Sequence, residues 1–392
     1  MSGTYFRAFF LAKYLVKEGH KVLLVLRSRE HSLKIVRKLL DGVNILLLPS
    51  LVTHETSSLV GSSSRVATVF MNTIQNCFLE IIHDFDVIHS FDVMWPQNAA
   101  PLLVSNLEGL LRIRHIKIYA DWDDWWGRGG IINLYKGLYR LIALPISFME
   151  EKVPRWADYV TLTTETLKYR ALQSGFKPEN LFIIPNGANV EDIKPLDRNN
   201  SRKELNLPLE NKICTQIWSS SRDLRSFKLL LQAHKKVTKV FPEALLLFVG
   251  RMKVSEAQID FVKSLNLSRN VMFAGWQPYH KYLLYLGASD VLLLPMQDTI
   301  YDRARSPLRL GDYLAAGRPI IATALPEVEK IVSQCGLVAT PNDAKDFGEK
   351  LLKILQDDDL SDEMGKRARE LAERKYSWQI LAKKLDQIYA HN

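Results

Sequence analysis

The residues best suited to chemistry lie between positions 301 and 323. Ser306 and Pro307 predict the start of a helix, because proline is favoured at the first helical position, and Gly317 predicts its end. Backbone N–H groups at a helix start bind anions, but the helix dipole contributes only about 0.3–1 kcal/mol. A bound diphosphate would therefore need cations as well. Three arginines flank this helix start: Arg303, Arg305 and Arg309.

Asp312 stands on the second turn of the same predicted helix. An ionised carboxylate at this place could accept hydrogen bonds from the diol of a ribose. The alternative is an amphipathic helix whose Asp and Arg side chains simply face solvent. We favour a site for a nucleotide diphosphate, because proline, glycine and charge coincide within so short a span.

Short apolar runs alternate with helical patterns along the chain, which predicts parallel sheets with crossover helices. The predicted strands are 21–26, 43–48, 86–90, 116–120, 158–163, 180–184, 213–218, 244–249, 270–274, 290–294 and 318–322. The predicted helices are 5–18, 64–83, 96–111, 134–152, 164–174, 342–356, 360–375 and 378–390, with further helices between the strands of the second half. A polar segment rich in Pro and Asn, 185–210, separates two similar halves.

The fold class that this order predicts is α/β, with two doubly wound Rossmann-like domains. We place an N-terminal domain at 1–195, a C-terminal domain at 196–375, and a C-terminal helix at 376–392 that could cross back to the first domain. Such a domain normally opens with a strand and a Gly-rich turn. Ser2-Gly3-Thr4 is interpreted as the end of that turn, and the chain has no room for the strand before it. Losing a central strand would cost about 6–12 kcal/mol, so we expect a truncated sequence or a misassigned start codon.

Composition narrows the function further. The chain has 392 residues, of which 47% are hydrophobic and 24% charged, and this excludes disordered and collagen-like proteins. Its three cysteines cannot form a disulfide framework or a four-ligand zinc site, which favours a reducing compartment, and we predict a cytoplasmic protein. The net charge of +9 indicates an anionic partner, and nine Lys or Arg against two Glu lie in the first 40 residues.

Several enzyme signatures are missing from the sequence. No strand runs into Gly-x-Gly-x-x-Gly, and there is no phosphate-loop motif, no Gly-x-Ser-x-Gly and no His-Glu-x-x-His. Nucleic-acid binding is disfavoured, because the basic residues are not interleaved with aromatic ones.

The run SPLRLGDYLAAGRPIIAT (306–323), with Pro185-Asn186-Gly187 and ASDVLLLP (288–295), resembles the donor side of retaining GT-B glycosyltransferases of the family-four or group-one type. Segments GTYFRAFFLAKYLVKEGHKV, NVMFAGW and KYSWQILAKKL agree with it, in order. The resemblance implies two domains that face each other across a cleft. It also implies a nucleotide-sugar donor on the second domain, an acceptor on the first, and neither metal nor cofactor.

The resemblance also implies roles for particular residues. Arg222 and Arg225 would hold the diphosphate and stabilise the leaving group, and Gly275-Trp276 would lie beside the base. The remaining donor-binding residues would be Gly3, Asn186, Gly187, Arg305, Ser306, Pro307, Leu308, Arg309 and Asp312. The chain departs from the family at Ala304, where the first of two carboxylates would stand, and Asp312 replaces the second, usually Glu.

The segment DWDDWWGRGG (121–130) follows a predicted strand at the place where a His is usual in the family. Its carboxylates and Trp rings could form a sugar-binding wall, with Asp121 or Asp123 acting on the acceptor as a catalytic residue. A structural reading, with Trp in the core and Asp capping a helix, weighs equally.

Three functions remain open at this point. The first is transfer of a sugar to an acceptor hydroxyl with retention. The second is a nucleotide-sugar epimerase or hydrolase, which would need no acceptor, and the third is a non-catalytic sugar-nucleotide-binding relative, favoured by Ala304. The apolar segment 131–149 and the basic first 40 residues also allow peripheral contact with an acidic membrane at its inner face, although burial of 131–149 in the core is the stronger reading.

Overall fold

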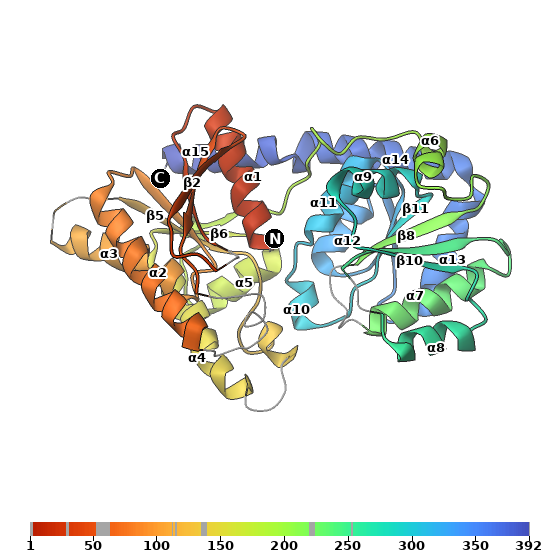
Figure 1. Cartoon of the computed structure of the whole chain (residues 1–392), viewed down its shortest axis with the longest axis horizontal. Coiled ribbons are helices and arrows are strands. Elements are labelled where there is room, and N and C mark those ends of the chain that lie inside the picture. Colours follow the sequence, from red (N-terminus) through yellow and green to blue (C-terminus); the bar gives the residue numbers. More distant parts are fainter. Residues whose placement is uncertain are drawn as a thin grey trace. The chain divides into compact units, whose positions relative to one another are not determined.

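The computed structural model describes residues 3–28, 31–51, 63–111, 113, 116–134, 139–218, 224–251 and 254–391. The chain forms two compact units (Figure 1). Unit 1 runs to Pro185 and takes up the chain again from Trp378, and unit 2 is Asn186–Ser377. The sequence analysis places the corresponding breaks at residues 195 and 375.

The strands of unit 1 form two sheets. A three-stranded sheet has the order β1-β3-β2, from β1(Leu23–Arg27), β3(Val43–Leu48) and β2(Val36–Leu40), and a four-stranded parallel sheet has the order β4-β5-β6-β7. The latter consists of β4(Val87–Phe91), β5(Lys117–Trp122), β6(Tyr159–Leu162) and β7(Leu181–Ile183). Among the described residues no strand pairs with both β1 and β4. The predicted α/β fold class is confirmed, and in unit 1 its strands are divided between these two sheets.

The sequence analysis misses β2, an antiparallel partner of β3. All five residues of β2 are exposed, so the strand lacks the continuous apolar run that marks a buried strand. Asp41 and Gly42 join β2 to β3, and both have a positive φ, of 50° and 81°. An Asp-Gly pair with this geometry is a common two-residue hairpin turn, and it was the sequence signal for β2.

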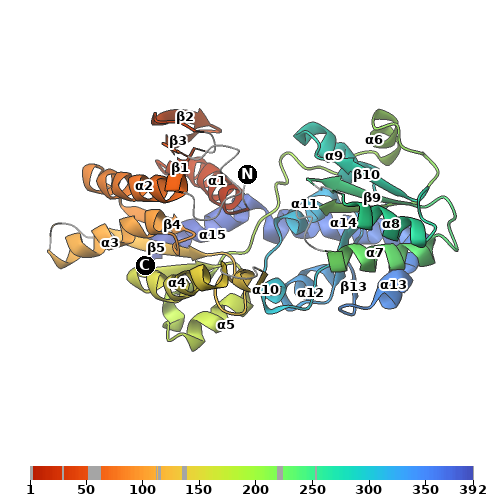
Figure 2. The same ribbon diagram turned by 60° about the horizontal axis from the view of Figure 1, so that its bottom comes forward.

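The α-helices in the described part of unit 1 lie around these sheets (Figure 2): α1(Gly3–Lys17), α2(Ser63–Ile82), α3(Pro96–Leu110), α4(Tyr139–Lys152), α5(Glu165–Gln173) and α15(Trp378–His391). The last helix belongs to unit 1 although it follows unit 2 in the sequence. The rings of Trp378 on α15 and Phe10 on α1 stack with their centroids 5.5 Å apart, which ties the C-terminal helix to the N-terminal one.

Unit 2 contains one six-stranded sheet of order β10-β9-β8-β11-β12-β13, with every pairing parallel. Its strands are β8(Ile213–Trp218), β9(Leu245–Gly250), β10(Val271–Gly275), β11(Val291–Leu294), β12(Ile320–Thr323) and β13(Gly336–Ala339). Its helices are α6(Arg198–Glu204), α7(Leu224–Val237), α8(Glu256–Ser264), α9(Tyr279–Ala288), α10(Ile300–Arg303), α11(Leu308–Ala316), α12(Pro326–Val332), α13(Ala344–Gln356) and α14(Asp358–Leu371). The predicted strands of this half are confirmed, and β13 was missed because it begins with Gly336 and only its last residue is fully buried, so it lacks a continuous apolar run.

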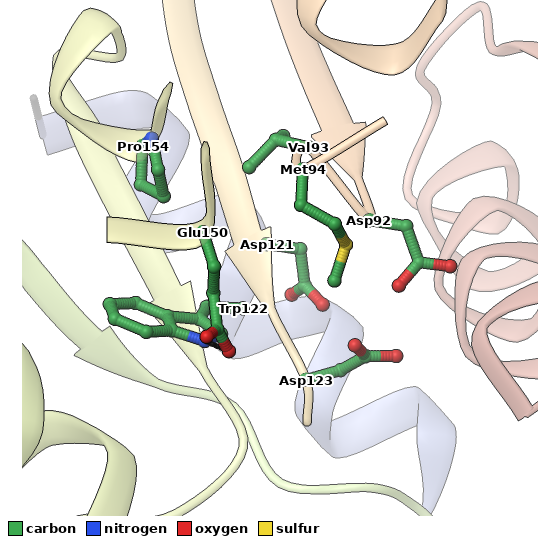
Figure 3. A pocket seen from close by; sticks show the side chains of 8 residues that line it. All are labelled: Asp92, Val93, Met94, Asp121, Trp122, Asp123, Glu150 and Pro154. Carbon is green, nitrogen blue, oxygen red and sulfur yellow. Dashed lines mark hydrogen bonds between the residues drawn. The ribbon is translucent and has the colours of Figure 1, made fainter. Parts of the chain in front are cut away.

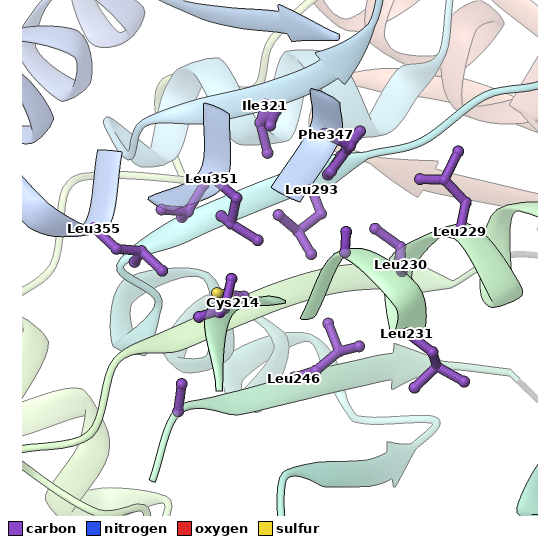
Figure 4. Packing of buried hydrophobic residues seen from close by; sticks show 14 of the residues in the cluster. Cys214, Leu229, Leu230, Leu231, Leu246, Leu293, Ile321, Phe347, Leu351 and Leu355 are labelled. Carbon is purple, nitrogen blue, oxygen red and sulfur yellow. The ribbon is translucent and has the colours of Figure 1, made fainter. Parts of the chain in front are cut away.

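The core of unit 2 explains its apolar strands. Leu246, Leu293 and Ile321 on three strands pack with Leu230 on α7 and Leu351 on α13, all buried (Figure 4). The chain order along this sheet reverses between β8 and β11, and ligands of such sheets bind beyond the carboxyl ends of the strands at that point. The residues that follow β8 and β11 are therefore placed for a binding site.

Candidate functional site

Helix α11 begins just beyond this point, as the sequence predicts. Pro307 is its N-cap residue, and no side chain caps the helix start. Gly317 ends the helix with a left-handed φ of 62° and donates its N–H to the Leu314 carbonyl. Because the N-terminal N–H groups of a helix lack intrahelical partners, an uncapped start can bind an anion.

The Asn186-Gly187 segment holds this helix start in position. The Asn186 backbone N–H donates to Ser306 Oγ at 3.1 Å, and its side-chain Nδ2 donates to the Ser306 carbonyl at 2.6 Å. The Gly187 carbonyl lies so close to α11 that a Cβ at Gly311 would be 2.2 Å from it. The predicted donor-binding residues Asn186, Gly187 and Ser306 thus form one packed unit with Pro307 and Leu308, in which Asn186 has a positioning role.

The arginines around α11 are held by separate partners. Arg303 forms an ion pair with Asp298, and Arg305 Nη1 lies 3.2 Å from Asp302 Oδ1. Arg305 also lies over the Tyr301 ring, 4.8 Å from its centroid. Arg309 Nη1 donates to the Ile217 carbonyl at 3.1 Å, near the carboxyl end of β8. Arg305 and Arg309 therefore flank the helix start in fixed orientations.

Asp312 lies on α11 and accepts a hydrogen bond from the Tyr282 hydroxyl at 2.7 Å. Burial raises the pKa of Asp312 to about 6, and the Tyr282 hydrogen bond acts in the opposite direction. The Tyr282 ring stacks on the Tyr279 ring with centroids 6.2 Å apart. Sequence reasoning missed both tyrosines, because α9 lies far from α11 in the chain and no motif connects them.

The structure describes both residues predicted to lie beside the base, Gly275 and Trp276, and one of the two arginines predicted to hold the diphosphate. Gly275 ends β10 with a φ of 67°, and the Trp276 ring that follows is 61% exposed, with the Arg251 guanidinium 5.9 Å from its centroid. An exposed, oriented ring of this kind suits stacking on a planar base.

The two arginines predicted to hold the diphosphate are described only in part. Arg225 is exposed on the first turn of α7, and Arg222 lies outside the described residues.

In unit 1, the carboxyl end of β5 carries the second predicted cluster. Asp121 is buried, and its carboxylate receives Arg7 Nε at 2.9 Å and Arg7 Nη2 at 2.8 Å. The Thr161 hydroxyl donates to the same carboxylate at 2.6 Å. Asp121 is thus one half of a buried, bidentate ion pair, and its role toward an acceptor stays a prediction.

A chain of hydrogen bonds continues from this pair to the C-terminal helix. His89 Nε2 lies 2.9 Å from Thr161 Oγ1, and His89 Nδ1 lies 2.6 Å from the Tyr389 hydroxyl. Burial lowers the pKa of His89 to about 4, so its ring is neutral near pH 7. Because Thr161 donates its proton to Asp121, His89 donates from Nε2 and accepts from Tyr389 at Nδ1.

Asp123 has different surroundings from Asp121. It accepts a hydrogen bond from the Thr4 hydroxyl at 2.9 Å, next to Gly3, which is exposed at the first position of α1. Ser2 lies outside the described residues, and Gly3 and Thr4 are helical here, whereas the sequence analysis interprets them as a turn. Figure 3 shows the carboxyl groups of Asp92, Asp121 and Asp123 lining one pocket together with Met94.

Asp92 is the functional candidate that the sequence analysis missed. It follows β4 directly, has a φ of 51°, and lies beside Asp123 because Phe91 of β4 pairs with Asp121 of β5. Burial and the charge of Asp124 raise the pKa of Asp92 to about 7, and burial and the charge of Asp92 raise the pKa of Asp123 well above its usual range. Its signal was its position after a predicted parallel strand.

The Trp residues of 121–130 pack around Glu150. Glu150 accepts from Trp122 Nε1 at 3.0 Å and from the Gly127 N–H at 2.6 Å, and Trp122 is buried. The Arg170 guanidinium lies 3.0 Å from Glu150 and 3.9 Å from the centroid of the Trp125 ring. The structural reading of Trp122 is therefore correct, and this packing shapes the loop that carries Asp123.

The described part of the chain lacks two kinds of feature. No group of three or more His, Cys, Asp or Glu side chains is arranged to hold a metal ion. None of the described helices has the length and apolar character needed to cross a membrane.

Family comparisons agree with this architecture. Residues 3–192 match the model for Glycosyltransferase Family 4, and residues 197–371 match the model for Glycosyl transferases group 1. The chain belongs to the group-one, family-four type of glycosyltransferase. The two family models together match nearly the full length of this glycosyltransferase.

Curated relatives are distant from this glycosyltransferase. It is 24% identical over 380 residues to the GDP-mannose-dependent monoacylated alpha-(1-6)-phosphatidylinositol monomannoside mannosyltransferase of Corynebacterium glutamicum, covering 89% of this chain and 94% of the relative. It is 28% identical over 220 residues to the D-inositol 3-phosphate glycosyltransferase of Corynebacterium jeikeium. That match covers 53% of this chain and spans only 51% of the relative.

Solved structures establish the GT-B fold. Sucrose-phosphate synthase from Thermosynechococcus elongatus is 18% identical, with a TM-score of 0.73 and coverage of 99% of this chain and 93% of that one. HepE of Anabaena, solved in complex with UDP and glucose, is 14% identical, with a TM-score of 0.68 and coverage of 100% and 96%. At these identities the likeness concerns the fold alone.

Proposed function

We propose that this glycosyltransferase moves a sugar from a nucleotide-diphosphate donor to an acceptor hydroxyl, with retention of the anomeric configuration. The observation that carries the proposal is the uncapped start of α11, flanked by Arg305 and Arg309 and followed on the next turn by Asp312. This arrangement offers N–H donors and cations to a diphosphate and a carboxylate to a ribose diol. The UDP in the HepE complex supports a nucleotide donor of this kind.

The main requirement of the reaction is to stabilise the leaving diphosphate, because its negative charge grows as the glycosidic bond breaks. Positive groups that are already in place stabilise that charge without reorganisation, and each good donor typically contributes about 2.7–4 kcal/mol. Arg305 and Arg309 are held by Asp302 and by the Ile217 carbonyl, so little reorganisation is needed. Arg222 and Arg225 would add to them, and no metal or cofactor is included in this proposal.

Unit 1 would present the carboxyl groups of Asp92 and Asp123 to the acceptor. Two adjacent carboxyl groups with raised pKa values share protons, and such a pair can both donate to and accept from a sugar hydroxyl. Asp123 would contact the acceptor, while Asp121, fully engaged by Arg7 and Thr161, would position the strand end.

Thermal unfolding with a panel of nucleotide sugars tests the donor. A true donor at 100 times its dissociation constant adds about 2.7 kcal/mol of stability. The stabilising nucleotide sugar is then incubated with candidate acceptors, and NMR of the product reports the anomeric configuration. An inverted product would contradict retention, and the absence of stabilisation by any nucleotide sugar would contradict the donor class.

The buried Ala304 favours a second candidate, a relative that binds a sugar nucleotide without transferring it, since no carboxylate stands at this position. Calorimetry would then show donor binding without turnover on any acceptor. Free nucleotide released from the donor alone would instead indicate an epimerase or a hydrolase.

Arg225 provides a direct test of the diphosphate site. Arg225→Ala should lower turnover at least tenfold without unfolding the protein, because a cation that stabilises the leaving group is worth about 2.7–4 kcal/mol. Lys228→Ala, an exposed change one turn along α7, is the matched control and should leave turnover unchanged. Equal turnover in Arg225→Ala and the unchanged protein would remove Arg225 from the site.

A further inference from the structure

Helix α2 presents an apolar face to solvent. Its outward side chains recur every three or four residues, so they form one stripe along the helix. They are more than half exposed, from 53% for Ile82 to 68% for Phe70. We call this set the α2 stripe: Val66, Phe70, Ile74, Phe78, Ile81 and Ile82. From Val66 to Ile82 the stripe extends for about 24 Å, and no charged residue interrupts it.

The opposite, polar face of α2 is the one that contacts the protein. Thr68 Oγ1 accepts the Leu51 N–H at 2.9 Å, and Asn72 Nδ2 donates to the Pro49 carbonyl at 3.0 Å. Further along, Glu80 accepts the Ser105 hydroxyl of α3 at 2.9 Å. Turning the stripe inward would break these bonds and bury their donors and acceptors unpaired. The outward direction of the stripe is therefore built into the helix.

The neighbouring hairpin adds an exposed basic segment. α2 is hydrogen-bonded to residues that directly follow β3, and β2 pairs with β3. Residues 33–40, which include β2, are all exposed. They combine five aliphatic side chains with three bases and contain no acid: Leu33, Lys34, Ile35, Val36, Arg37, Lys38, Leu39 and Leu40. Exposed aliphatic side chains mixed with bases are typical of a surface that enters an interface rich in negative charge.

We infer that the α2 stripe and the β2 segment dock unit 1 on an acidic lipid bilayer. Apolar side chains of the stripe would enter the acyl region, and Lys34, Arg37 and Lys38 would contact anionic headgroups. A second copy of the chain fits this surface less well than a bilayer does. A twofold interface uses the same surface of both copies, so it would bring the two basic β2 segments together, and their positive charges would repel. This surface differs from the segment 131–149 predicted from the sequence, of which 135–138 lie outside the described residues.

Vesicle co-sedimentation of the full chain tests the inference. The probes are phosphatidylcholine vesicles with and without about 30 mol% phosphatidylglycerol. We expect binding to the acidic vesicles that falls at least tenfold in the double variant Phe70→Ser/Phe78→Ser. Arg37→Glu/Lys38→Glu should also bind weakly and lose its salt dependence. Ile259→Ser on α8 of unit 2, at an exposed apolar residue outside the proposed surface, is the matched control and should bind as the unchanged protein does.

Several outcomes of these measurements would contradict the inference. Failure of the unchanged protein to sediment with acidic vesicles would refute it. Binding of both double variants as strong as that of the unchanged protein would refute it as well. A concentration-dependent dimer that the Phe70/Phe78 variant abolishes, without vesicle binding, would assign the stripe to a second copy instead. Unchanged thermal unfolding of each variant shows that these exposed substitutions leave the fold intact.

Discussion

Two aspartates two residues apart show how surroundings determine the role of a carboxylate. Asp121 is neutralised by the bidentate Arg7 guanidinium and the Thr161 hydroxyl. Asp123 faces Asp92 and the Thr4 hydroxyl, and its pKa is raised. Asp121 is fully engaged by these two partners, whereas Asp123 and Asp92 have raised pKa values and line the pocket together, so Asp123 and Asp92 are the better candidates for acceptor contact.

The Arg7–Asp121 pair predicts a large effect on stability. Arg7→Ala leaves Asp121 buried without its cation, and removing one partner of a buried pair typically costs about 3–5 kcal/mol. Urea unfolding of the purified protein measures the loss. Lys383→Ala removes the partly exposed pair with Glu18 and should cost less than about 1 kcal/mol. Similar losses in the two variants would contradict a structural role for Arg7.

The Tyr282–Asp312 bond predicts a pH effect on donor binding. Ionised Asp312 is the form that accepts a ribose hydroxyl, so donor affinity should rise as pH increases through about 6. Tyr282→Phe removes the hydrogen bond that lowers the pKa of Asp312 and should move this rise to higher pH. Calorimetry across the pH range measures it. Tyr279→Phe is the control, because its hydroxyl bonds Asn189. Identical profiles in both variants would exclude Asp312 from donor binding.

The raised pKa of Asp312 also makes the stability of the protein depend on pH, in the direction opposite to that of donor binding. The folded-state pKa of Asp312 is raised from 3.8 to about 6, so the folded protein holds the proton more tightly than the unfolded chain. The contribution of Asp312 is thus fully present below pH 3.8 and is lost as pH rises through about 6. Donor binding and stability therefore respond to this carboxyl in opposite directions.

At the scale of elements, the position of α11 depends on its close approach to the 186–187 loop. Gly311→Ala should destabilise the protein and weaken donor binding, because the new Cβ would lie 2.2 Å from the Gly187 carbonyl. Calorimetric unfolding and donor titration measure the two effects. Gly109→Ala on α3 has nothing within 4 Å and should stabilise by up to about 1 kcal/mol through helix propensity. A stabilised Gly311→Ala would show that the helix start can shift without loss.

At the scale of the whole molecule, the last helix stabilises a unit that the chain left nearly two hundred residues earlier. Trp378→Ala should cost about 3–5 kcal/mol, since this buried ring stacks on Phe10. Hydrogen exchange should then increase in α1 more than in the helices of unit 2. Trp218→Ala, at a buried ring of unit 2, should show the converse pattern. Loss of protection in unit 2 alone after Trp378→Ala would contradict this assignment of α15.

The sequence by itself determined most elements and the motif around α11. Buried parallel strands need continuous apolar runs, and helix ends need Pro and Gly, so β8, β9 and α11 are readable locally. The exposed strand β2 and the four-residue β13 lack such a run, and the division of the unit 1 strands into two sheets depends on pairing between distant segments.

Tertiary structure alone decided the charge and the neighbours of the site residues. The sequence places Asp121, Asp123 and Asp312 correctly at a strand end or on a helix, but their partners come from 114 residues away for Arg7 and 30 residues away for Tyr282. Burial and hydrogen bonding depend on such distant contacts, and local spacing carries no information about them. For the same reason, only the folded chain shows that the polar face of α2 contacts the protein while its apolar face points outward.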